Sequence, residues 1–199
     1  MTPSLNIASM MICSMPKYLN GMLLLSCSDS VWNPVDVLPD DIRPYVTDEL
    51  GNQDIQYGGF LQLIDPKGLD LLSSKGLFAC FRCITDQYLE HVGTCPPKDV
   101  YQSLIKNLKF MGWDIATGNG WLSASSHGSF PINPFTGIAV DSNNSKINEY
   151  GLFSSLDDCL KYCQINDTQI PEHAPWFPVA IYVDESSYIR LNKARQQLL

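Results

Sequence analysis

Short apolar runs along the chain predict strands at several places. The segments "GGFLQLID" (58–65) and "GLFACFRCI" (76–84) are rich in apolar and aromatic residues and are separated by a polar turn. The pair Asn20-Gly21 in "YLNGMLLLSCS" precedes another apolar run, and this dipeptide is a strong hairpin signal. Near the end of the chain, the proline-rich segment "PEHAPWFP" leads into a buried strand that we expect over 179–183.

A three- and four-residue spacing of apolar positions predicts the longest mid-chain helix over 98–111. The spaced residues are Val100, Leu104, Leu108 and Met111, with Ile105 beside them. Gly112 follows the last of them and is expected to end this helix. The segments "WDIA" and "WLSA" then predict a hairpin around 117–120, across which Trp113 and Trp121 would face each other.

Two further helices are expected after residue 150. Ser154 and Asp157 form a capping-box-like start for the first, which should end near Asn166. The tail "SSYIRLNKARQQLL" predicts a closing helix with positive charges toward its C-terminal end. These elements predict a single α+β domain over 1–199, with a mixed or antiparallel sheet packed against two or three helices. We expect that sheet to include 78–84 and 179–183.

The composition and charge of the chain narrow its function classes. Of 199 residues, 45% are apolar and 17% are charged, which is typical of a globular protein. Asp and Glu number 21 against 13 Lys and Arg, so the formal net charge is -8, which disfavours direct nucleic-acid binding and suits a basic protein partner. The run "GMLLLSC" is too interrupted for an export signal, and no stretch is apolar enough for a membrane span. We therefore expect a cytoplasmic protein that does not contact a membrane.

The seven cysteines predict free thiols, because their number is odd and their spacing irregular. One set has the spacing C-x2-C-x7-H-x3-C and could bind a structural zinc: Cys80, Cys83, His91 and Cys95. A strand over 76–84 would place Cys80 and Cys83 on opposite faces, so we expect no metal ion and no cofactor. Cys159 and Cys163 are four residues apart on a predicted helix, which indicates a core stripe shared with Leu156 and Leu160.

Two histidines in loops leave an enzyme as an alternative. His127 lies in "SSHGSFP" and His173 in "PEHAPWFP", and the two could converge on one cleft near Cys95, Ser126 or Glu172. No G-x-S-x-G elbow, HExxH helix or phosphate-binding glycine loop is present in the sequence. A catalytic role for these histidines therefore has no motif behind it.

A protein-binding surface is the interpretation that we favour. The loops 117–137, 141–150 and 170–178 are together rich in Trp, Phe, Tyr, His, Asn and Pro, and the run from Asp36 to Asp54 is acidic. Aromatic anchors inside a polar rim are the usual composition of an interaction hot spot. The candidate binding residues are Asp36, Asp40, Asp41, Asp48, Glu49, Trp121, His127, His173 and Trp176.

Two segments carry a resemblance to a known class of proteins. They are the acidic run "VDVLPDDIRPYVTDEL" and the end "NEYGLFSSLDDCLKYCQIN…PEHAPWFPVAIYVDE". With them the chain resembles the bacterial immunity proteins of polymorphic-toxin, contact-dependent and type VI secretion systems. The resemblance implies a protein that blocks a cognate toxin, often a basic nuclease, by covering its active site or holding it inactive. The alternatives are a small enzyme with a His127/His173 site and a phage or mobile-element accessory binding protein.

Overall fold

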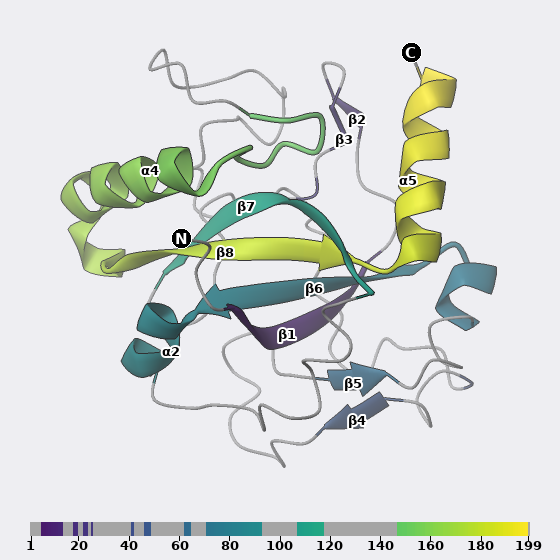
Figure 1. The fold of residues 1–199 in the computed structure, drawn as a ribbon, viewed down its shortest axis with the longest axis horizontal. Helices are drawn as coiled ribbons and strands as arrows, with labels where there is room; N and C mark the ends of the chain where they lie inside the picture. The colour runs from purple at the N-terminus through teal and green to yellow at the C-terminus, as the bar shows by residue number, and fades with distance from the viewer. Residues whose placement is uncertain are drawn as a thin grey trace.

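The computed structural model describes residues 5–13, 18–19, 22–23, 25, 41, 46–48, 62–64, 71–92, 107–117 and 147–198. Its central feature is a four-stranded sheet in the order β1-β6-β8-β7, in which every neighbouring pair is antiparallel (Figure 1). The strands are β1 (Leu5–Cys13), β6 (Phe78–Thr85), β8 (Trp176–Val183) and β7 (Lys109–Thr117). Two small ladders accompany it: β2 (Tyr18–Leu19) with β3 (Met22–Leu23), and β4 (Val46–Asp48) with β5 (Gln62–Ile64).

Helices cover both faces of the sheet, so the architecture is α+β. α4 (Leu156–Gln169) packs on β8 and β7 on one face, and the short helix η6 (Pro171–His173) connects it to β8. α2 (Asp86–Val92) and α5 (Glu185–Leu198) contribute to the core of the other face. Figure 1 shows α2 and α4 toward one end of the sheet and α5 standing at the opposite end.

The core forms two clusters because side chains alternate along each strand. On β6, Phe81 and Cys83 belong to the α4 face, whereas Cys80 and Ile84 belong to the other. The α4 face also buries Trp113, Ile115, Cys159, Tyr162, Cys163 and Ala180. The opposite face buries Tyr88, Tyr150, Val179, Ile181, Val183 and Leu191. β8 is apolar at nearly every position because both of its faces are covered.

Several expectations from the sequence are confirmed. The sheet is antiparallel, and its strands β6 and β8 contain the segments 78–84 and 179–183, which are neighbours in the sheet. β2 and β3 pair on either side of Asn20 and Gly21, as the hairpin signal predicts. β5 lies within the predicted strand 58–65.

The predicted helix over 98–111 is wrong at its end. Residues 109–111 are extended and open β7, while 98–106 lie outside the described residues. Gly112 ends no helix: it lies inside the strand, at a bulge between Phe110 and Gly112, with φ +143. Trp113 is bridged to Phe153 by two backbone hydrogen bonds of 2.9 and 2.8 Å. Its predicted partner Trp121 lies outside the described residues.

The helix predicted after residue 150 begins one residue later than expected. Ser155, not Ser154, is the cap: its backbone is extended and its hydroxyl oxygen accepts the Asp158 amide at 3.1 Å. The Ser155 hydroxyl in turn donates to the Asp158 carboxylate at 2.8 Å. The helix ends at Gln169 rather than near Asn166. Cys159 and Cys163 are buried as predicted, but Leu160 is 38% exposed and does not belong to the core stripe.

Candidate functional site

The structure describes only part of the predicted binding surface. Five of the candidate residues lie outside the described residues: Asp36, Asp40, Glu49, Trp121 and His127. Asp41 is exposed and forms an ion pair with Lys75, with 3.0 Å between the Asp41 Oδ2 and Lys75 Nζ atoms. Asp48 is the last residue of β4. The Asp41 carboxylate therefore contacts a lysine of the chain itself, which partly compensates its negative charge.

Trp176 is not an exposed anchor, and this prediction is wrong. It is the first residue of β8, its side chain is 3% exposed, and it belongs to the core beneath α4. Its amide donates to Asp167 Oδ1 at 2.8 Å, and its ring nitrogen donates to the Ile170 carbonyl at 3.5 Å. The cause is the strand itself, because consecutive residues of β8 face two covered sides and neither Trp176 nor Phe177 reaches solvent.

Two of the histidines lie at the same end of the sheet but on opposite faces. His173 is half-buried and meets the Trp176 ring edge-on, at 6.4 Å between ring centroids. His91 is exposed and tilts against the Phe177 ring at 5.1 Å. Because Trp176 and Phe177 are consecutive strand residues, the sheet separates the two imidazoles. The predicted convergence of His173 with His127 involves His127, which lies outside the described part of the chain.

Four cysteines, Cys80, Cys83, Cys159 and Cys163, are free and buried. Burial raises the pKa of the Cys83 thiol, and the nearby Cys80 adds to this effect. Burial also raises the pKa of Cys159, whose thiol donates to the Asp114 carbonyl at 3.3 Å. A raised pKa keeps a thiol protonated and therefore poorly nucleophilic. Within the described ranges, no three His, Cys, Asp or Glu side chains are grouped so that they could hold a metal ion, and Cys95 of the zinc alternative is not among the described residues.

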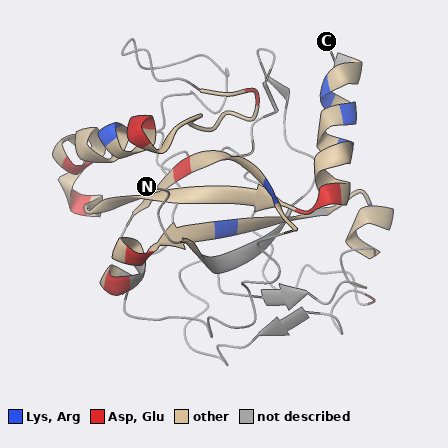
Figure 2. Ribbon diagram, in the orientation of Figure 1, with Lys and Arg blue, Asp and Glu red and all other residues tan. Residues whose placement is uncertain are grey.

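Three elements carry carboxylates at the end of the sheet where β7 ends and β8 begins: α2 on one face, and α4 and η6 on the other. We call this set the carboxylate end: Asp86, Glu90, Asp167 and Glu172. Three of the four are exposed and Asp167 is half-buried. α2 and η6 contain no Lys or Arg, and the one lysine of α4, Lys161, lies 3.5 Å from Asp158 Oδ1. Figure 2 shows acidic positions on α2 and α4 and the basic positions of α5 at the far end.

The fold fixes this end through buried contacts. The Tyr88 hydroxyl of α2 donates to the Thr117 carbonyl at 2.6 Å, and its ring stacks on Phe177 at 4.4 Å. On the other face, Asp167 ties the last turn of α4 to the Trp176 amide. The helices that carry the carboxylates are thus attached to two adjacent residues of β8. The elements that carry the exposed charges of the carboxylate end are therefore anchored to the sheet by these contacts.

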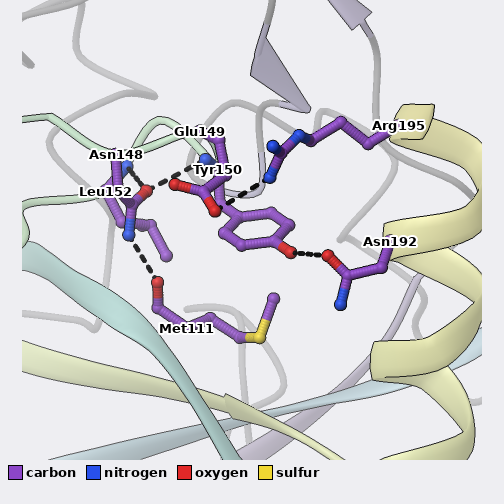
Figure 3. A network of polar contacts seen from close by, with 7 residues as sticks. All are labelled: Met111, Asn148, Glu149, Tyr150, Leu152, Asn192 and Arg195. Atoms are coloured by element: carbon purple, nitrogen blue, oxygen red, sulfur yellow. Dashed lines mark hydrogen bonds and ion pairs between the residues drawn. The ribbon is translucent and has the colours of Figure 1, made fainter. Parts of the chain in front are cut away.

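A second polar cluster joins the turn 147–153 to β7 and α5 (Figure 3). The Asn148 side chain donates to the Met111 carbonyl at 2.6 Å and accepts the amides of Tyr150 and Leu152 at 2.9 and 3.2 Å. The next two residues reach α5: Arg195 Nη1 lies 2.9 Å from Glu149 Oε1, and the Tyr150 hydroxyl donates to Asn192 Oδ1 at 2.7 Å. Burial, and then the charge of Glu149, raises the pKa of Tyr150, so the phenol stays protonated and remains a donor at neutral pH.

Sequence reasoning missed both Asn148 and Phe110. Asn148 organises the turn "NEYG", whose Gly151 has φ +70; an Asn three residues before a glycine is the signal that could have found it. Phe110 is 44% exposed, and its ring lies 5.3 Å from Tyr182 and 5.7 Å from Trp113. No sequence signal indicated its exposure, because the segment around it was interpreted as a helix.

Comparisons with protein-family models, curated proteins and solved structures found no match to this chain. No helix in the described part of the chain is long and apolar enough to cross a membrane.

Proposed function

We propose that this chain is a binding protein that neutralises a basic protein toxin by direct contact, as bacterial immunity proteins do. The observation that carries the proposal is the carboxylate end. Asp86, Glu90 and Glu172 are exposed there, and α2 and η6 carry no lysine or arginine, although each contains one histidine, His91 and His173. A surface of one charge sign attracts a partner of the opposite sign and discriminates against partners of the same sign.

The distribution of charge within the chain supports this choice of surface. Elsewhere several exposed carboxylates lie close to a basic group: Asp41 is paired with Lys75, Glu185 with Lys109 and Glu149 with Arg195. Each of those partners offsets the field of its carboxylate. The three exposed members of the carboxylate end come from elements that contain no lysine or arginine of their own. Together with the net charge of -8, this favours a cationic partner.

The fold offers the partner a pre-organised surface. α2 and the end of α4 are anchored by Tyr88 and Asp167, so little ordering is needed when a partner binds. Pre-organisation lowers the entropic cost of association. The proposed mode of action is therefore steric and electrostatic: the chain covers a basic surface of the toxin and requires no reaction of its own.

Co-expression with the product of each neighbouring gene tests the proposal. We expect one neighbour to arrest growth alone and the chain to restore it. The triple variant Asp86→Asn, Glu90→Gln and Glu172→Gln should lower protection. The matched control removes the same number of exposed carboxylates elsewhere, with Asp157→Asn, Glu149→Gln and Glu185→Gln, and should protect almost like the parent chain.

The outcomes test the proposed function and the proposed binding surface separately. If no neighbour is toxic, the proposed function is wrong. If the chain protects and both triple variants protect equally, the function stands but the carboxylate end is not the binding surface. In that case, charge reversal at Asp40 and Asp41 tests the acidic run that the sequence suggests. Folding of each variant is checked by circular dichroism and thermal melting.

A further inference from the structure

α5 is held to the rest of the protein in two different ways along its length. At its start, Asp184 Oδ1 accepts the Ser187 amide at 2.9 Å and caps the helix. One turn on, Arg190 donates to the carbonyls of Ser73 and Leu77 at 3.3 and 2.5 Å. Leu191 is fully buried in the core cluster. The first two turns are thus fixed by a cap, by two backbone carbonyls and by apolar burial.

The last two turns, residues 192–198, have a much weaker attachment. None of the residues 192–197 is buried. Their described polar contacts with the rest of the protein include the Tyr150–Asn192 hydrogen bond, the Glu149–Arg195 ion pair and a hydrogen bond between the Tyr150 and Arg195 side chains; α5 also contacts β3. Figure 3 shows the first two of these contacts reaching α5 from consecutive residues of one turn. We call these four residues the clasp.

The turn side of the clasp is rigid. Asn148 binds the backbone of Met111 and of Leu152, and the Asn148 amide donates to the Leu152 carbonyl at 2.8 Å. Tyr150 is 5% exposed. The turn is therefore anchored to β7 whether or not α5 is in contact with it. Any movement at the clasp falls on the α5 side.

We infer that residues 192–198 open as a unit at the clasp, while residues 185–191 and the sheet stay in place. The Glu149 and Arg195 side chains are 45% and 29% exposed, so salt screens their attraction and shifts the equilibrium toward the open form. Opening breaks the contacts of the clasp and exposes no fully buried residue of 192–197. It uncovers the Glu149 carboxylate and the Tyr150 hydroxyl on an otherwise unchanged turn, and so adds a salt-responsive polar surface to the protein.

Hydrogen exchange followed by mass spectrometry tests the inference on the isolated chain. In Tyr150→Phe, the amides of 192–198 should exchange about two- to tenfold faster, because the hydrogen bonds between the phenol and α5 are lost. In Arg195→Gln they should exchange about two- to fivefold faster, as expected for an exposed ion pair. Lys193→Gln is the control: it removes the same charge from the same exposed half of α5 and should have little effect. Residues 185–191 should keep their protection in all three variants.

The salt dependence of hydrogen exchange provides a second test of the inference. Raising NaCl from about 50 mM to about 500 mM should accelerate exchange of 192–198 in the parent chain and have no further effect in Arg195→Gln. Exchange of all of α5 at a single rate would overturn the inference, and so would an effect of Lys193→Gln as large as that of Arg195→Gln. A salt effect that persists unchanged in Arg195→Gln would also overturn it. The measurement needs no partner, so its outcome is separate from that of the proposed function.

Discussion

Replacement of Gly112 by alanine tests the junction between β7 and the turn 147–153. A Cβ atom at this position would lie 2.6 Å from Leu152 Cβ and 2.8 Å from Asn148 Nδ2. The backbone also has φ +143, which side-chain-bearing residues rarely adopt. Backbone strain costs about 1–3 kcal/mol and overpacking about 1–3 kcal/mol. We therefore expect Gly112→Ala to lower the free energy of unfolding by about 2–6 kcal/mol.

Gly76→Ala is the matched control for this measurement. Gly76 also has a positive φ, of +72, but a Cβ there meets no atom within 4 Å. Its cost is then the strain alone, roughly 1–2 kcal/mol. Urea unfolding followed by tryptophan fluorescence gives both values, and the difference between them contains the contact with the turn together with any difference in backbone strain. Equal costs for the two variants would refute the close approach of Gly112 to Asn148 and Leu152.

Three further outcomes follow from the described contacts. Ser155→Ala should cost about 1 kcal/mol of stability through loss of the helix cap, whereas Ser154→Ala should change stability by less than about 0.5 kcal/mol; thermal melting compares the two. The Cys83 thiol stays protonated in the folded protein, while the unfolded chain loses that proton near the ordinary pKa of 9.0, so stability is full below pH 9.0 and falls above it. The slope is at most about 1.4 kcal/mol per pH unit for this thiol, and Cys83→Ala should remove that part in urea titrations at rising pH. Tyr150→Phe should cost about 1 kcal/mol, more than Arg195→Ala, because an exposed ion pair contributes less than a partly buried hydrogen bond; equal effects in urea unfolding would contradict this order.

The strands of the sheet could be predicted because their signal is local. β6 and β8 are continuous apolar runs bounded by turn residues, and the alternation of Cys80 and Cys83 between faces follows from strand geometry. The predicted helix cap was wrong by one residue because two serines, Ser154 and Ser155, precede the helix. Only the backbone conformation decides which of them accepts the first free amide.

The structural role of Gly112 could not be predicted from its neighbours in the sequence. A glycine after apolar residues at helical spacing is typical of a helix end, but it is equally suited to a bulge in a strand. The deciding contact comes from Asn148 and Leu152, far along the chain. The candidate site also depends on contacts between distant segments. Trp176 is buried because α4 covers its face of the sheet. The carboxylate end consists of residues that lie between positions 86 and 172 of the sequence. Such groupings depend on topology, which the pattern of one segment does not contain.

The most direct test of the account is the association rate constant between this chain and the purified product of the toxic neighbour, measured by stopped-flow fluorescence at increasing salt. For a complex steered by the carboxylate end, we expect the rate constant to fall at least about tenfold between roughly 50 mM and roughly 500 mM NaCl. The Asp86→Asn, Glu90→Gln, Glu172→Gln variant should associate more slowly at low salt and lose most of this dependence. A rate constant that does not change with salt, or that the triple variant leaves unaltered, would contradict the account.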